Sequence, residues 1–162
     1  MRRFGRTLSL VWLMFPMVAA AGDLADTEAA IDTVLSTLHQ AAADADGEVY
    51  LDLFAEDAVF MGTDATERWS VAELKAFAEP YFSQGRGWTY LMKERNIFVS
   101  SNGQTAWFDE SLWNDTYGTC RGTGVLVLTD GAWRIVQYNL VIPIPNDLAR
   151  GFAEKIKEYE SR

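Results

Sequence analysis

The sequence predicts a small α+β domain in which helices cover a curved antiparallel sheet. Two observations carry this prediction. In the first half of the chain, apolar residues recur three and four positions apart over residues 26–44 and again over 71–82, as on one face of a helix. From Trp88 onward the period becomes that of strands, and tight-turn residues separate four strand segments. Helices and strands that are segregated along the chain in this way are typical of the α+β class.

The helical half has clear start signals. Asp26 or Thr27 can cap the first helix, because their side-chain oxygens accept first-turn amides. Ser70 and Glu73 have the spacing of a capping box, which predicts a helix start at residue 71. The elements expected in this half are helices over residues 26–44, 49–54 and 71–82 and a short strand over 58–61.

The strand half is divided by turns. Asn102-Gly103 and Asp130-Gly131 are tight-turn pairs typical of hairpins. Two prolines, at 143 and 145, end the last strand because they lack the amide that a sheet ladder needs. Asn146 can then cap a final amphipathic helix. The expected elements are strands over residues 88–99, 105–113, 121–128 and 132–142 and a helix over 147–159.

The first 21 residues are typical of a secretory signal peptide. A basic start over residues 2–6 precedes an apolar run over 7–18, and small residues lead to Ala21. The apolar run is shorter than the roughly 20 residues that a membrane span needs. We therefore expect cleavage near Ala21, a periplasmic or secreted protein, and a single domain over residues 22–162.

Composition excludes several classes of partner and cofactor. The chain has 23 acidic and 14 basic residues, a net charge of −9, whereas nucleic acids and anionic membranes both require a basic face. Cys120 is the only cysteine, so no internal disulfide is expected, and a small buried apolar role suits it. With one histidine and no phosphate-binding or nucleophile motif, we expect neither a metal nor a cofactor.

Several segments resemble a known superfamily. Residues 53–60, LFAEDAVF, resemble the helix-to-strand junction of the nuclear transport factor 2-like proteins. Five more segments resemble its SnoaL-like branch: residues 62–69, 107–110, 120–122, 131–136 and 138–140. The resemblance covers about residues 26–146. It implies a cone-shaped fold with helices packed around a pocket, and a homodimer, but no particular reaction, because one scaffold can host many functions.

The chain differs from the isomerases of that superfamily. Those enzymes carry a general-base carboxylate just after the short first strand, where this chain has Met61-Gly62-Thr63. They also carry a tyrosine in the first helix, and this chain has none near His39. No catalytic residue is therefore transferred from the isomerases.

Two residues are candidates for proton transfer. His39 is the only histidine and lies beside the apolar stripe of the first helix; an imidazole there can act as an acid or base, or can simply bind a nearby acid. Asp109 and Glu110 are consecutive in a strand, so they point to opposite faces. We expect Asp109 to face inward because it shares a face with Trp107, and a salt bridge at the rim is the alternative.

Further residues are candidates to contact a ligand. Arg121 can bind an anionic ligand or pair with Asp109 on the neighbouring strand. In the last strand, Gln137 and Asn139 share a face with two apolar residues, as in a pocket wall. Loop charges and tryptophans near the expected mouth complete the set. The ligand-binding candidates are Asp64, Arg68, Trp69, Trp88, Trp107, Arg121, Gln137 and Asn139.

The sequence leaves three functions open. The first is a protein that binds a small, largely apolar molecule carrying one polar or acidic group. The second is a cofactor-independent cyclase or isomerase that uses Asp109 or His39 for proton transfer. The third is a homodimeric association module whose exposed apolar row is Val136, Tyr138 and Leu140.

Overall fold

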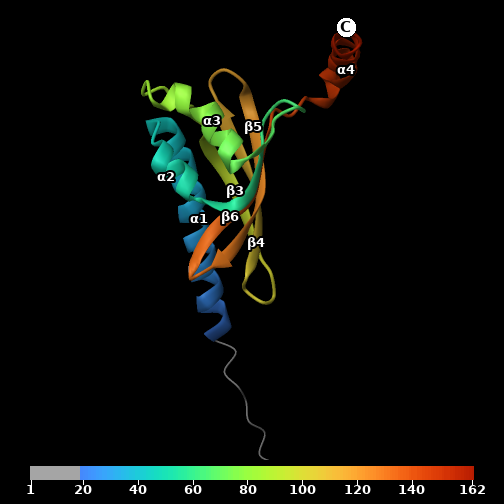
Figure 1. The fold of residues 1–162 in the computed structure, drawn as a ribbon. Coiled ribbons are helices and arrows are strands. Elements are labelled where there is room, and N and C mark those ends of the chain that lie inside the picture. The colour runs from blue at the N-terminus through green and yellow to red at the C-terminus, as the bar shows by residue number, and fades with distance from the viewer. Residues whose placement is uncertain (1–18) are drawn as a thin grey trace, which may run out of the picture.

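The computed structural model describes residues 19–162, and the greater part of the predicted signal peptide, residues 1–18, lies outside the described residues (Figure 1). The predicted cleavage site at Ala21 falls in the first turn of the first helix. Within the described residues, no helix is both long and apolar enough to cross a membrane.

The α+β prediction is confirmed, and the strands form one six-stranded sheet in the order β2-β1-β6-β5-β4-β3. Helices α1, α2 and α3 lie on one side of this curved sheet (Figure 1). The elements are α1 (Ala19–Asp44), α2 (Gly47–Asp52), β1 (Phe54–Met61), β2 (Arg68–Ser70), α3 (Val71–Phe82), β3 (Leu91–Val99), β4 (Thr105–Asn114), β5 (Gly118–Thr129), β6 (Ala132–Val141) and α4 (Asn146–Glu160).

Local signals placed α3 correctly. It has the predicted bounds, and the capping box is present: the Glu73 carboxylate accepts the Ser70 amide at 2.8 Å, and the Ser70 hydroxyl accepts the Glu73 amide at 3.4 Å. The Asp130-Gly131 turn is also confirmed, with φ angles of 52° and 80°. Two positive φ angles in a row suit a two-residue hairpin turn, because its twist matches that of the flanking strands.

The predicted caps of the two terminal helices are wrong. Asp26 and Thr27 lie inside α1, which begins at Ala19, because the alanine-rich segment before them is itself a good helix former. Asn146 is the first residue of α4 and not its cap; Pro145 stands at the cap position, without a side-chain hydrogen bond.

The pairing of β1 with β6 is parallel, whereas every other pair in the sheet is antiparallel. The sequence predicted an antiparallel sheet and placed β2 in a loop, because β2 is only three residues long and the pairing of β1 with β6 joins segments far apart in the chain. The parallel register sets Phe60 opposite Tyr138, and their rings stack with centroids 5.5 Å apart. A long-range pairing thus builds part of the inner wall.

A β-bulge in β6 changes which residues face inward. Opposite β6, Val125 pairs with Gln137 and the next residue, Leu126, pairs with Ile135, so Val136 is the extra residue. Because a bulge shifts the alternation of a strand by one, Ile135 is buried before it and Tyr138 is buried after it. The prediction that Gln137 and Asn139 face the pocket while Tyr138 and Leu140 face outward is therefore wrong.

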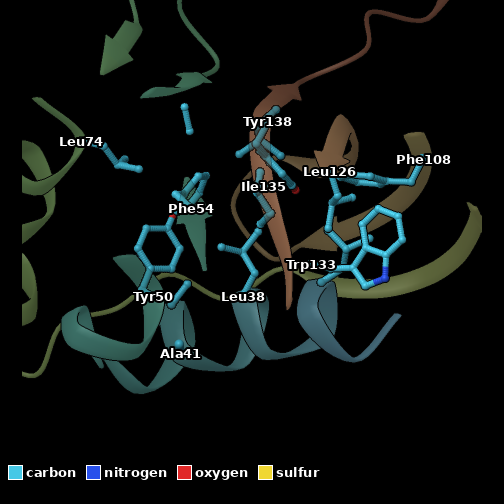
Figure 2. Close-up of a cluster of buried hydrophobic side chains, with 14 of the residues drawn as sticks. Leu38, Ala41, Tyr50, Phe54, Leu74, Phe108, Leu126, Trp133, Ile135 and Tyr138 are labelled. Carbon is cyan, nitrogen blue, oxygen red and sulfur yellow. The ribbon is translucent and has the colours of Figure 1, made fainter. Parts of the chain in front are cut away.

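The core lies between the helices and the concave face of the sheet. Figure 2 shows Leu38 of α1 and Tyr50 of α2 projecting from the helix layer and Ile135 of β6 projecting from the sheet. All three side chains are at most 2% exposed. Helix α4 is separate from this core. None of its residues is buried, and it projects from the end of β6 away from the domain (Figure 1).

Candidate functional site

The centre of the inner face holds a buried carboxylate, that of Glu110 on β4. Its side chain is inaccessible to solvent. One oxygen, Oε1, lies 2.8 Å from His39 Nε2 of α1 and accepts the Tyr138 hydroxyl of β6 at 2.9 Å. A carboxylate that is ionised can only accept hydrogen bonds, so the proton shared with His39 is on Nε2. Glu110 thereby connects its own strand, β4, with α1 and β6.

Arg95 of β3 neutralises this carboxylate. Its Nε donates to Glu110 Oε2 at 2.9 Å, and its Nη2 lies 2.8 Å from the same oxygen, as an ion-pair contact too poorly aligned for a second hydrogen bond. Its Nη1 reaches α1, where it donates to the Asp32 carboxylate at 2.7 Å and to the Ser36 hydroxyl at 3.1 Å. The arginine side chain is only 2% exposed. Both charges are therefore buried and paired.

The hydrogen bonds fix the protonation of this cluster. Burial alone would raise the pKa of Glu110, but the hydrogen bonds and charges of His39 and Arg95 outweigh burial and lower it. Burial, together with the adjacent Glu110 charge and hydrogen bond, raises the pKa of Tyr138 well above its ordinary value. At neutral pH the network is therefore an ionised carboxylate that receives hydrogen bonds from the neutral Tyr138 phenol, from the His39 ring and from the Arg95 guanidinium.

A glycine makes room for the network. Gly122 of β5 is paired with Glu110, and a Cβ at this position would lie 2.6 Å from both Glu110 Oε1 and the Tyr138 hydroxyl. No other residue fits there without moving the hydrogen-bonded pair. The buried carboxylate and the glycine opposite it are thus one structural unit.

The expectation that Asp109 faces inward is wrong. Ala106, Phe108 and Leu112 are buried on the same face as Glu110, whereas Asp109 and Trp107 are exposed on the outer face. Three apolar side chains outweigh the single tryptophan on which the expectation rested. Asp109 accepts a hydrogen bond from Asn96 at 3.2 Å on that outer face.

A pocket of about 520 Å³ opens at the end of the sheet where β6 leaves it. Stacked aromatic rings form one wall. The ring centroids of Phe60 and Trp69 are 6.1 Å apart, and those of Trp69 and Phe77 are 4.6 Å apart. Seven of the lining residues are aromatic. The lining consists of Phe60, Gly62, Thr63, Glu67, Trp69, Leu74, Phe77, Gly87, Trp88, Thr89, Tyr90, Leu91, Trp113, Asn114, Asp115, Thr116, Tyr117 and Leu140.

The buried network adjoins this pocket through a small cavity. The cavity has a volume of about 20 Å³, is bordered by His39 and Tyr138, and shares Phe60, Trp88 and Leu140 with the pocket. This volume corresponds to roughly one water molecule. Of the two network residues that border the cavity, His39 is the more accessible, with 12% of its side chain exposed.

The structure brings together only some of the predicted site residues. Trp69 and Trp88 line the pocket, and His39 borders the small cavity beside it. Asp64 and Arg68 are exposed in and after the loop that follows β1, and neither is among the lining residues. The four remaining ligand candidates are on the outer face of the sheet: Trp107, Arg121, Gln137 and Asn139.

The predicted pair between Asp109 and Arg121 is not among the ion pairs of the described residues. In the ladder, Arg121 stands opposite Ser111 and Asp109 stands opposite Thr123, so the two charges are two positions apart. Arg121 is exposed.

Sequence reasoning missed Arg95, Tyr138 and the inward position of Glu110, although each left a signal. Arg95 alternates with Ile97 and Val99, which are partly buried on the inner face. In β6 the large apolar residues Trp133 and Ile135 occupy odd positions, whereas Val136, Tyr138 and Leu140 occupy even ones, which marks the bulge.

The chain belongs to the SnoaL-like domain family, which it matches over residues 31–145. The resemblance noted in the sequence is thereby confirmed, and α4 begins just after the matched region. Among curated proteins, none matches the sequence.

Solved structures share the fold at low identity. A nuclear transport factor 2-like protein with a cystatin-like fold from Novosphingobium aromaticivorans is 18% identical, with a TM-score of 0.62, over 83% of this chain and 93% of that one. A nuclear transport factor 2-like protein of unknown function from Pseudomonas putida is 14% identical, with a TM-score of 0.61, over 80% and 91%. A protein of unknown function from Mycobacterium tuberculosis is 18% identical, with a TM-score of 0.62, over 85% and 81%. These similarities establish the fold alone.

Proposed function

We propose that this chain binds a small, largely apolar molecule in the pocket at the end of β6. The observation that carries the proposal is the lining: seven aromatic residues, together with six polar or charged ones, around about 520 Å³. Ligand sites typically have volumes of roughly 300–1,000 Å³ and a predominantly apolar lining with a few placed polar groups. Fold membership supports a pocket protein but selects no ligand.

Binding should be detectable with a neutral fluorescent probe, N-phenyl-1-naphthylamine, whose emission rises in apolar surroundings. We expect Trp69→Ala to weaken binding by about three- to tenfold, because the indole stacks in the aromatic wall. Tyr159→Ala is the control, since this ring is 75% exposed on α4 and is not among the lining residues. Equal affinities in both variants and the wild type would contradict the pocket as the binding site.

A second candidate function is proton-transfer catalysis by His39. The specific observation in its favour is the 2.8 Å contact with Glu110, because a catalytic histidine is commonly oriented by a carboxylate on one nitrogen while the other faces the substrate. The small cavity that borders His39 and adjoins the pocket has room for about one water molecule. A substrate in the pocket would then exchange protons with His39 through that water.

Acylation by diethylpyrocarbonate tests whether His39 communicates with the pocket. His39 is the only histidine of the chain, so the absorbance change at the imidazole band of the untagged protein reports on this residue alone. We expect slow modification that the neutral probe suppresses by about tenfold or more, because a ligand in the pocket covers the access route. His39→Gln provides the blank. Modification at an unchanged rate with probe bound would exclude the catalytic candidate.

We propose, in addition, that the outer face of the sheet forms a homodimer. The row expected from the sequence is wrong, since Tyr138 and Leu140 are buried. Instead, Phe98 and Trp107 stack with centroids 5.8 Å apart and are 45% and 47% exposed. An exposed aromatic pair on a sheet face is a typical interface anchor.

Trp107→Asp should shift the protein from dimer to monomer, because a charge would be buried in the interface without a partner. Sedimentation velocity measures the change. Lys93→Gln on the edge strand β3 provides a control that changes the net charge by the same one unit at an exposed position. A wild-type protein that sediments as a monomer at micromolar concentration would refute the dimer.

A further inference from the structure

The charged side chains that line the pocket are all acidic. Among the lining residues that the structure describes, the charged ones are Glu67 and Asp115, and none is lysine or arginine. An anionic ligand would therefore lose its hydration in the pocket without gaining a counter-charge. The sequence expectation of an acidic group on the ligand relied on Arg121, which is on the outer face.

Arg68 stands between two lining residues but is exposed and does not itself line the pocket, and the other nearby cations are bound elsewhere. Arg95 is bound to Glu110 and Asp32. The Arg86 guanidinium lies over the Tyr81 ring, 5.1 Å from its centroid, and His39 directs its Nε2 at Glu110. The whole chain carries a net charge of −9, which adds a field that attracts cations.

Both carboxylates are fixed in place by local hydrogen bonds. Glu67 closes a tight loop after β1: its carboxylate accepts the Asp64 amide at 3.1 Å and covers Gly62 so closely that a Cβ there would overlap it. Asp115 accepts the indole N–H of Trp113 at 2.9 Å, which holds a carboxylate and an aromatic ring together. In each carboxylate, one oxygen accepts this local hydrogen bond, and the other oxygen remains for a ligand.

The remaining polar groups of the wall add no competing charge. Burial is the main cause that raises the pKa of Tyr90 to about 12, with smaller contributions from Cys120, Tyr117 and Glu67. Its hydroxyl is therefore neutral at physiological pH, as are the threonines and Asn114.

We propose that the ligand is an organic monocation: an ammonium or quaternary ammonium group held near Glu67 and Asp115, with an apolar body on the rings of Phe60, Trp69 and Phe77. Aromatic faces attract such cations because the ring quadrupole is negative above the plane, and desolvated sites strengthen the attraction. This inference rests on the proposed ligand-binding function and names its ligand class.

Isothermal titration with three naphthalene compounds tests the proposal: (2-naphthylmethyl)trimethylammonium, neutral 2-naphthylmethanol and anionic 2-naphthylacetate. We expect the cation to bind about tenfold tighter than the neutral compound, and the anion to bind more weakly than both. In the Glu67→Gln/Asp115→Asn double variant, the preference for the cation over the neutral compound should fall to about twofold or less.

A matched double variant distinguishes the effect of the two pocket carboxylates from the effect of the net charge of the protein. Glu48→Gln/Glu79→Gln removes the same two charges from residues of α2 and α3 that do not line this pocket, and the cation preference should persist there. If thermal melting shows that the first double variant is unfolded, the single Asp115→Asn change at an exposed position gives the same readout. An anion that binds as tightly as the cation, or a preference that survives without both carboxylates, would overturn the ligand class and leave the pocket proposal intact. Failure of all three compounds and of the neutral probe to bind would overturn both.

Discussion

Replacing Glu110 with alanine should lower the free energy of unfolding by about 3–5 kcal/mol, as expected when one partner of a buried ion pair is removed. The change leaves the guanidinium of Arg95, which is 2% exposed, without its main counter-charge. It also removes the acceptor of the buried Tyr138 hydroxyl. Urea unfolding followed by tryptophan fluorescence measures the loss.

The neighbouring residue provides the control. Asp109→Ala makes a comparable deletion on the exposed face of the same strand and should change the free energy of unfolding by less than about 0.5 kcal/mol. If Glu110→Ala does not fold, Glu110→Gln keeps an acceptor oxygen and should give a smaller but measurable loss. Equal effects at positions 109 and 110 would mean that the buried network contributes nothing to stability.

The same carboxylate should make the fold sensitive to acid. Its pKa is lower in the folded protein than its ordinary value of 4.5, so the unfolded chain binds this proton more readily. Its stabilising contribution is therefore complete above that ordinary value and is lost as the pH falls through the lower, folded-state value. The stability difference between wild type and Glu110→Gln should accordingly stay constant well above pH 4.5 and shrink as the pH falls below it.

Gly122→Ala should have the next largest effect, a loss of about 1–3 kcal/mol, which is the usual range for overpacking a core. The added Cβ would lie 2.6 Å from both Glu110 Oε1 and the Tyr138 hydroxyl, and 2.9 Å from Glu110 Cγ. To make room for the Cβ, Glu110 Oε1 and the Tyr138 hydroxyl must move apart, which breaks the hydrogen bond between them. Chemical unfolding, with hydrogen exchange at β4 as a second measure, detects the change.

Gly151→Ala is the matched control for that substitution. Gly151 is helical, and a Cβ there meets nothing within 4 Å, so the same methyl group should cause no loss of stability. If Gly122→Ala proved as stable as wild type, the network would be loose enough to rearrange, and the rigid geometry assigned to Glu110 would be wrong.

What the sequence could predict was local. The capping box at Ser70, the Asp130-Gly131 turn and the strand periods depend on neighbours within a few residues, and the corresponding elements lie where expected. The parallel pairing of β1 with β6 and the bulge at Val136 depend on partners far along the chain. A one-residue shift in β6 then exchanged the inner and outer faces beyond it, which reversed the assignments of Tyr138 and Asn139.

The candidate site likewise contains residues that the sequence could reveal and residues that it could not. Trp69 and Trp88 were found because they bracket a helix that the sequence defines well, and a helix end beside a sheet is a natural place for a pocket wall. Glu110 was missed because facing was judged from one tryptophan and not from the three apolar residues that share its side of β4. An ion pair such as that of Glu110 with Arg95 leaves no spacing signal, because its members are on different strands.

Helix α4 has a consequence for the behaviour of the protein in solution. The family match ends at Pro145, and no residue of α4 is buried. Leu148, Phe152 and Ile156 are spaced four residues apart, which places them along one side of the helix, and they are 45–54% exposed. An apolar side that the domain leaves uncovered adds to the accessible apolar surface and favours self-association at high protein concentration.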